Sequence, residues 1–264
     1  MDTTYETVNA SNIIDFKGRI NYRTVNTAIA LLCVISNLIL LAVFLGYREF
    51  RTKCVLLIQL SVADLIYSMS AVYTGFEQIQ LYATAISTLK IPLKTSAECA
   101  LDIGIQSKLI GDVLIAMTIL WMGMERFIAI TFPFFYRISV DRRYLRCILV
   151  PILSAVIVIV VLLFGLMCVL SDNHSLTYNC GRKSTFGTAF SAFIYISCIV
   201  SNLMSTTLNA FAYGKARTTM KNNPRQAQHH VDTIRYYLLI SVLSAVLVSV
   251  PNFISLYKVY LGQV

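Results

Sequence analysis

Long uncharged apolar segments, separated by short charged ones, form the dominant pattern of this chain. Four segments contain no acidic or basic residue, namely 24–47, 147–171, 184–214 and 236–257. A helix of about 20 apolar residues is long enough to cross the hydrocarbon core of a lipid bilayer. Each of the four segments therefore predicts a transmembrane span.

Two further apolar segments contain a few charged residues. Residues 54–75 are interrupted only by Asp64. Residues 103–132 contain four charged side chains, those of Lys108, Asp112, Glu125 and Arg126. We therefore expect six spans, at about residues 24–47, 54–75, 103–132, 147–170, 187–213 and 236–257.

The composition of the spans selects helices over strands. Backbone polar groups inside a bilayer find no water, so a spanning segment is either a helix or part of a closed barrel. Barrel strands alternate apolar and polar residues, whereas residues 156–164 are apolar without alternation. The sequence predicts an all-α membrane protein, with residues 1–23 as a polar extracellular tail and residues 24–264 as the helix bundle.

The distribution of charge predicts the orientation. Hydrophobic residues make up 57% of the chain and charged residues 13%, against about 25% charged in a soluble domain. Twelve Lys and Arg residues follow spans one, three and five, whereas seven lie in the N-terminal tail and after spans two and four. Basic loops stay in the cytoplasm, so we expect a multi-pass plasma-membrane protein with an extracellular N-terminus. The net charge of +9 then reflects topology and not nucleic-acid binding.

The extracellular segments contain two glycosylation sequons and two cysteines. Asn9 and Asn173 each begin an Asn-x-Ser triplet, which is an acceptor for N-glycosylation. Cys99 precedes span three and Cys180 follows span four, on the oxidising side where disulfides persist. A Cys99–Cys180 bridge is expected, with two free thiols or a bridge to Cys168 as the alternatives.

The end of the third span carries the most informative motif. Glu125-Arg126-Phe127 closes the apolar segment, Pro133 follows seven residues after the arginine, and Tyr136 comes three residues later. This spacing resembles the cytoplasmic end of the third helix of rhodopsin-like (class A) G-protein-coupled receptors. Asn37, Leu60-Ser61-Val62-Ala63-Asp64 and Pro251 extend that resemblance. Over about residues 26–257 the chain looks most like nematode serpentine chemoreceptors of the Srsx group.

The resemblance implies a rhodopsin-like helix bundle that detects a small-molecule or peptide ligand and activates a heterotrimeric G protein. Arg126 would engage the G protein, and Glu125 would hold it in the resting state. Phe134 would offer an apolar contact to the G protein, and Tyr213 would move toward Arg126 on activation. A receptor dimer is a further partner compatible with this family.

The resemblance also assigns the polar residues of the other spans. Asn37 and Asp64 would form a polar core that binds a sodium ion, and a hydrogen bond between them is expected; simple interhelical contact is the alternative. Pro251 would kink helix six, because proline removes a backbone hydrogen bond. No other cofactor and no metal site are expected.

The ligand pocket is expected at the outer half of span three. Lys108 and Asp112 are four residues apart, so they share a helix face and can pair. The two side chains either bind a polar or charged ligand or form an ion pair with each other. Tyr73 and Glu77, near the outer end of span two, are expected to contribute to the pocket.

Three features depart from the receptor pattern. Ser249 replaces the aromatic residue that usually precedes the helix-six proline, helix five lacks its proline, and the single tryptophan, Trp121, lies in span three. Six spans would place Val264 outside and leave no seventh helix, as expected either for an incomplete gene product or for a true six-span variant. A truncated, non-signalling receptor-derived protein, acting as a decoy or dimer partner, is therefore the main alternative.

Two other classes fit less well. A secondary transporter would also bury Asp64, Lys108 and Asp112, but the chain lacks the paired halves typical of transporters. An intramembrane enzyme would need catalytic motifs such as His-Glu-x-x-His or Gly-x-Ser-x-Gly. Neither occurs, and the three histidines lie in predicted loops. We expect a receptor and not an enzyme.

Overall fold

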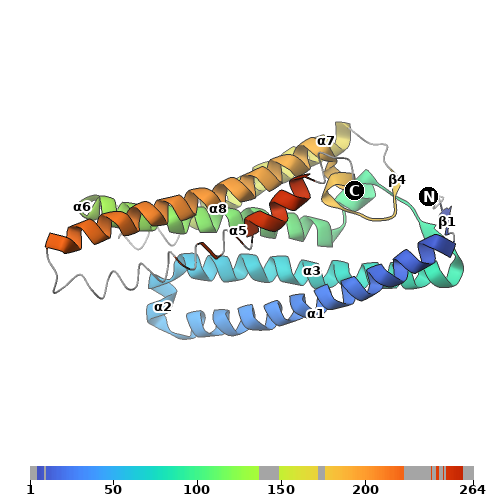
Figure 1. Cartoon of the computed structure of the whole chain (residues 1–264), viewed down its shortest axis with the longest axis horizontal. Coiled ribbons are helices and arrows are strands. Elements are labelled where there is room, and N and C mark those ends of the chain that lie inside the picture. Colours follow the sequence, from blue (N-terminus) through green and yellow to red (C-terminus); the bar gives the residue numbers. More distant parts are fainter. Residues whose placement is uncertain are drawn as a thin grey trace. The chain divides into compact units, whose positions relative to one another are not determined.

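The computed structural model describes residues 5–8, 10–136, 149–171, 176–222, 239, 242–243, 246 and 248–257. Within these residues the chain is an all-α membrane helix bundle with four short strands (Figure 1). The helices are α1 (Ala10–Gly46), α2 (Arg48–Lys53), α3 (Val55–Thr88), α4 (Ser96–Ala100), α5 (Ile103–Thr131), α6 (Pro133–Phe135), α7 (Val150–Ser171) and α8 (Arg182–Asn222). The strands are β1 (Tyr5–Thr7), β2 (Lys90–Pro92), β3 (Lys94–Thr95) and β4 (Leu176–Thr177).

Five of the described helices are long and apolar enough to cross a membrane. They correspond to the first five predicted spans, and their apolar segments are Ile13–Gly46, Val55–Thr88, Ile103–Thr131, Val150–Leu170 and Arg182–Thr218. Of the sixth predicted span, residues 248–257 are described as one continuous stretch, and they are helical. The helical prediction is therefore confirmed wherever the structure describes a span.

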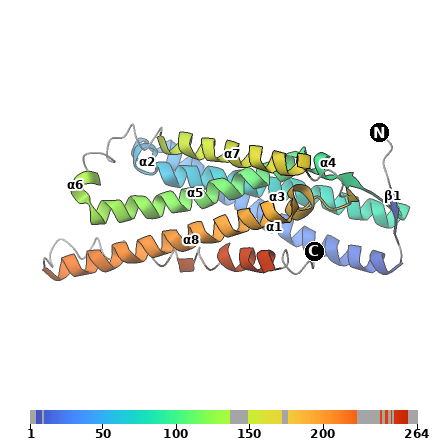
Figure 2. The same ribbon diagram turned by 90° about the horizontal axis from the view of Figure 1, so that it is seen from above.

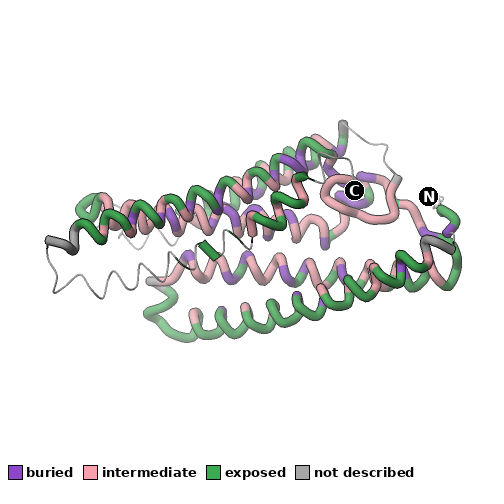
Figure 3. The backbone as a smooth tube through the Cα atoms, in the orientation of Figure 1, coloured by how far each residue is buried: buried purple, intermediate pink, exposed green. Residues whose placement is uncertain are grey.

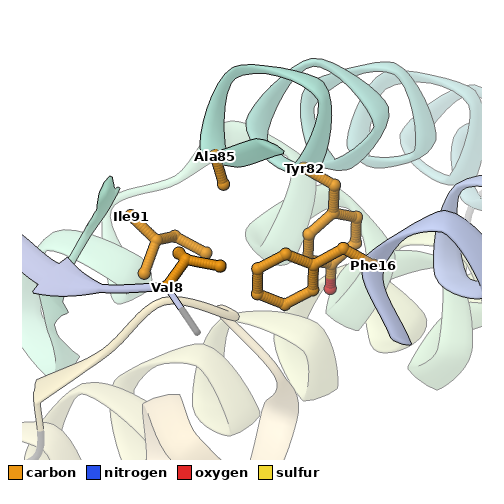
Figure 4. Packing of buried hydrophobic residues seen from close by; sticks show 5 residues of the cluster. All are labelled: Val8, Phe16, Tyr82, Ala85 and Ile91. Carbon is orange, nitrogen blue, oxygen red and sulfur yellow. The ribbon is translucent and has the colours of Figure 1, made fainter. Parts of the chain in front are cut away.

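α1 begins at Ala10, before residue 24, where the first membrane span is predicted to start. The extension is stabilised by packing of α1 on the outer end of α3. Phe16 stacks on Tyr82 with ring centroids 5.2 Å apart, and both are buried with Val8, Ala85 and Ile91 (Figure 4). Residues 10–23 also contain charged side chains, so the pattern of uncharged apolar segments does not predict this part of the helix.

The chain divides into two compact units. Unit 1 comprises Met1–Gly46, Ser61–Asp112 and Val158–Ser191. In it, β1 pairs antiparallel with β2, and β3 pairs antiparallel with β4. Leu89, with φ at 55°, ends α3 in the left-handed conformation that commonly stops helices.

Unit 2 comprises Tyr47–Leu60, Val113–Ile157 and Ala192–Val264. Inside this unit the hydroxyl of Ser205 on α8 donates to the carbonyl oxygen of Ile119 on α5, at 2.9 Å. Figure 2 shows α5 and α8 next to each other. A second interhelical bond, from the Gln59 amide to Ser154 Oγ at 2.9 Å, joins α3 to α7.

The outer surface of the helices is apolar. Along most of α1 the residues are exposed (Figure 3), and they include Leu32 and Ile39, which are 65% and 60% exposed. Water would penalise so much exposed apolar surface, whereas lipid tails do not. The exposed faces therefore fit a chain whose solvent is the bilayer.

Candidate functional site

The loops at the outer end of unit 1 are tied to its helices. A disulfide joins Cys99 to Cys180, with their Cα atoms 5.3 Å apart. This confirms the predicted bridge and excludes Cys168 as the partner. Thr95 and Glu98 form a reciprocal capping box at the start of α4, an arrangement that satisfies two otherwise unpaired backbone donors. The segments before α5 and before α8 are thus held together.

Beneath these loops lies a cavity of about 300 Å³, entirely within unit 1. It is lined by α3, by the loop that contains β2 and β3, by the start of α5 and by the segment after β4. The lining residues are Thr74, Glu77, Gln78, Gln80, Leu81, Thr84, Pro92, Lys94, Asp102, Ile105, Tyr178, Asn179 and Cys180. We call this space the outer cavity, because the orientation predicted from the sequence places it on the extracellular side.

Two carboxylates and one ammonium group line the outer cavity. Glu77 accepts a hydrogen bond of 2.7 Å from the Tyr73 hydroxyl, one turn earlier on α3. Asp102 caps α5, because its Oδ1 accepts from the backbone N–H groups of Gly104 and Ile105 at 2.8 and 3.3 Å. Its other oxygen lies 4.0 Å from Lys94 Nζ. The lining therefore carries an excess of one negative charge, at Glu77.

Gln78, which also lines this cavity, carries a buried acceptor without a partner among the described residues. The side-chain amide of Gln78 donates to Asn179 Oδ1 at 2.9 Å. Its Oε1 atom is buried and accepts no hydrogen bond from the described residues. A buried unpaired carbonyl is unfavourable by about 1–3 kcal/mol, so this atom lowers the local stability of the fold.

The predicted pair of Lys108 and Asp112 does not form. Asp112 instead accepts a hydrogen bond from the Arg182 guanidinium, and the two side chains are 19% and 14% exposed. Lys108 places its ammonium 5.7 Å from the ring centroid of Tyr67, a cation–π distance. Among the described residues no carboxylate lies within ion-pair distance of Lys108. Asp112 pairs with Arg182 and not with Lys108 for two reasons. The planar guanidinium matches the geometry of a carboxylate, and the disulfide holds the segment that contains Arg182 close to α5.

Neither Lys108 nor Asp112 lines the outer cavity, whereas Glu77 does. Sequence reasoning missed the contributions of Arg182, Gln78, Lys94 and Asp102. Arg182 comes two residues after Cys180, so the predicted disulfide was the available signal for its position. Gln78, Lys94 and Asp102 line the cavity because of how the loops fold against α3 and α5. No local pattern in the sequence reveals that arrangement.

The inner end of α5 shows how the Glu125-Arg126 motif is arranged in unit 2. α5 ends at Thr131, and Pro133 begins the short helix α6, where its missing N–H is harmless. The turn brings Tyr136 back, and its hydroxyl donates to Glu125 Oε1 at 3.0 Å. Phe134 is 79% exposed, as an apolar contact residue would be.

The remaining predicted residues are placed individually. Arg126 and Tyr213 are half-buried in unit 2. In unit 1 the Asn37 amide donates to the Cys33 carbonyl oxygen at 3.0 Å, so this donor is used within α1 and not on half-buried Asp64. Pro251 lies within the helical residues 248–257.

The predicted glycosylation sites and the predicted sodium site complete the set of sequence-based predictions. Asn9 and Asn173 lie outside the described residues. Around Asp64, the described residues contain no group of three or more His, Cys, Asp or Glu side chains suited to a metal ion.

Comparison with known proteins identifies the family. No curated protein matches the chain. The sequence profile of the serpentine type 7TM GPCR chemoreceptor Srsx family matches residues 30–261, which covers all six predicted spans apart from the first turns of the first one. The helices, the Cys99–Cys180 bridge and the motif at the inner end of α5 agree with that match. The chain belongs to the Srsx family of serpentine chemoreceptors.

Proposed function

We propose that this chemoreceptor binds a small polar ligand in the outer cavity and activates a heterotrimeric G protein through Arg126. The ligand would approach from outside the cell, and the N-terminus would be extracellular. The observation that carries the proposal is that one continuous helix, α5, has Ile105 of the cavity near one end and Glu125-Arg126 near the other. If a ligand displaced this helix, Glu125 and Arg126 would therefore move with it.

The chemistry of the cavity supports a ligand with hydrogen-bond donors. Glu77 contributes the unbalanced negative charge, and its carboxylate oxygens accept hydrogen bonds. A primary ammonium group supplies three donors and a positive charge. A volume of about 300 Å³ fits a molecule at the small end of the usual ligand range. We therefore propose small primary amines as the ligand class.

At the inner end, the proposed mechanism depends on the Glu125 carboxylate. Tyr136 holds this group in place through its hydroxyl at 3.0 Å, and Glu125 would restrain Arg126 in the resting state. Release of Arg126 would expose a permanent cation with five donors. Phe134, which is 79% exposed, would add apolar contact with the G protein.

The test is nucleotide exchange on a purified heterotrimeric G protein, with the chain reconstituted in lipid nanodiscs. The probes are a panel of primary amines, with matched alcohols and carboxylic acids. We expect a subset of the amines to stimulate exchange, and Arg126→Ala to abolish the stimulation. Arg217→Ala, which removes an exposed arginine of α8, is the matched control and should retain it.

A second variant separates ligand recognition from coupling. Glu77→Gln keeps the shape of the side chain and removes its charge, so it should raise the half-maximal amine concentration about tenfold or more without changing the maximal rate. Full exchange by the Arg126→Ala protein would refute the role of Arg126. An unchanged amine response of the Glu77→Gln protein would refute the cavity assignment.

A sodium ion at Asp64 remains part of the proposal. Asp64→Asn should remove any dependence of amine potency on sodium concentration, with potassium as the control salt. Equal sodium dependence in both proteins would exclude Asp64 as the ligand of the ion.

A further inference from the structure

A second cavity lies within unit 2, at the inner ends of α5 and α8. Its volume is about 550 Å³, and apolar atoms dominate its walls. It is lined by Phe127, Thr131, Thr207, Ala210, Phe211, Gly214, Lys215 and Thr218. We call this space the inner groove. It shares no lining residue with the outer cavity.

The inner groove opens on the exposed side of α8. Thr207, Ala210 and Phe211 are exposed, and Phe211 is 66% exposed. Ser205 and Asn209 of the same helix are buried, with Ser205 bonded to α5. In a chain of this family the exposed side of a spanning helix meets lipid. The groove is therefore open to acyl chains and not to the interior of the helix bundle.

The groove also lies at the boundary of the hydrocarbon layer. α5 ends at Thr131, which lines the groove. On α8 the groove reaches Lys215, the first charged residue after the uncharged segment 184–214. Lys215, one turn before Thr218, is exposed. Its ammonium donates to the Thr131 carbonyl oxygen at 3.2 Å and lies 5.9 Å from the ring centroid of Phe132. These contacts hold a positive charge at the polar end of an apolar groove.

The Lys215 ammonium carries three N–H donors and a positive charge, which is the chemistry that recognises a phosphate. The sequence adds basic residues shortly after the two segments that form the groove: Arg137 follows Thr131 by six positions, and Lys221 follows Thr218 by three. Cytoplasmic leaflets carry anionic lipids, and basic pockets between spanning helices on this side bind their headgroups.

We propose that the inner groove binds an anionic glycerophospholipid, with an acyl chain between α5 and α8 and the headgroup phosphate on Lys215. Such a lipid would contact Phe127, the neighbour of Arg126, and so would influence the coupling motif directly. The assignment to the cytoplasmic leaflet rests on the orientation in the proposed function. The binding itself does not depend on signalling.

Native mass spectrometry of the full chain in detergent tests the proposal. The probes are phosphatidylserine and phosphatidylcholine with identical acyl chains. We expect phosphatidylserine to be retained preferentially, and Lys215→Gln to lower its retention about fivefold. Lys215→Arg should restore retention. Arg217→Gln removes an equally exposed charge outside the groove and should leave retention within about twofold of the original protein.

A second pair of variants tests the apolar part. Ala210→Trp should fill the groove and prevent retention of phosphatidylserine, whereas Met204→Trp, on an exposed face of the same helix outside the groove, should not. Thermal unfolding identifies variants that fail to fold. A photoreactive phosphatidylserine with its label on the acyl chain should mark peptides that contain residues 127–131 and 207–218.

Three results would overturn the proposal. Equal retention of the two lipids would show that charge plays no part, and equal losses in Lys215→Gln and Arg217→Gln would show that no particular lysine is used. Photolabelling outside the groove would place the lipid elsewhere, with the groove left to another occupant such as a protein helix. None of these measurements involves nucleotide exchange, so their failure would leave the proposed function intact.

Discussion

The Asp112 carboxylate and the Arg182 guanidinium form an ion pair in which neither side chain is more than 19% exposed. Removing one partner of a shielded pair leaves a charge with neither water nor counter-ion, which is far more unfavourable than removing both. Lys108, four residues before Asp112, uses the ring of Tyr67 instead. The stability of this region therefore depends on Arg182 more than on Lys108.

A double-mutant cycle measures this preference. We expect Asp112→Asn and Arg182→Gln to be coupled by about 1–3 kcal/mol, because the double variant removes both charges together. Asp112→Asn and Lys108→Met should be coupled by less than about 0.5 kcal/mol. Unfolding can be followed by the fluorescence of Trp121, the single tryptophan. Stronger coupling to Lys108 than to Arg182 would contradict the observed pairing.

The hydroxyl of Tyr136 is the second residue-scale feature with a testable consequence. Tyr136→Phe removes the donor at 3.0 Å from Glu125 Oε1, a bond to a charged group worth ~1.5–3 kcal/mol. Because a less constrained Glu125 holds Arg126 less firmly, ligand-free nucleotide exchange should rise about fivefold. Tyr47→Phe, at a residue that is 64% exposed, is the control. Unchanged basal exchange would show that the hydroxyl does not restrain the motif.

Close packing of helices is the main feature at the scale of elements. In unit 2, a Cβ added to Gly123 of α5 would lie 2.6 Å from Ser205 Oγ and 2.8 Å from Ser205 Cα. In unit 1, a Cβ at Gly111 would lie 2.8 Å from Tyr67 Cβ. Lipid provides little hydrophobic force between helices, so small residues that permit close approach contribute much of the association.

The substitution Gly123→Ala tests the α5–α8 contact. One methyl group must displace the backbone of α8, so we expect a loss of about 1–3 kcal/mol in the free energy of unfolding. Gly18→Ala is the matched control, because a Cβ there meets nothing within 4 Å. The control should be neutral or stabilising by up to about 1 kcal/mol. Equal effects of the two substitutions would show that α8 does not pack closely on Gly123.

At the scale of the whole molecule, cross-links between distant segments decide how the loops are placed. The Cys99–Cys180 disulfide joins residues separated by 81 positions, and the β3–β4 pair lies next to it. Together these features hold the segment that supplies Tyr178, Asn179 and Arg182. The outer cavity and the Asp112 ion pair both depend on that placement.

Replacing both disulfide cysteines by alanine should lower the free energy of unfolding by about 2–5 kcal/mol. The amine response should weaken as well, because one wall of the cavity loses its attachment. Cys168→Ala, which leaves the bridge intact, should change neither property. A similar loss in the Cys168→Ala protein would mean that the cysteines act through packing and not through the bridge.

The orientation of the whole chain is tested by its sequons. If the N-terminus is extracellular, Asn9 and Asn173 are accessible to glycosylation in the secretory pathway. Peptide N-glycosidase should then increase the gel mobility of the expressed protein, and Asn9→Gln with Asn173→Gln should remove that shift. An N-terminal epitope should also bind antibody on intact cells. Binding only after permeabilisation would reverse the topology and move the inner groove to the outer leaflet.

The sequence by itself determined the membrane class, the helical character of the spans and the family. Each follows from local information, since a bilayer demands long apolar helices and the Glu125-Arg126 motif is contiguous. The tertiary structure decided the start of α1, which depends on Phe16 packing against Tyr82. It also decided that Asp112 pairs with Arg182. Spacing along one helix shows which of its own side chains can contact each other. Only the folded chain shows that a residue distant in the sequence, Arg182, forms the ion pair with Asp112 in place of Lys108.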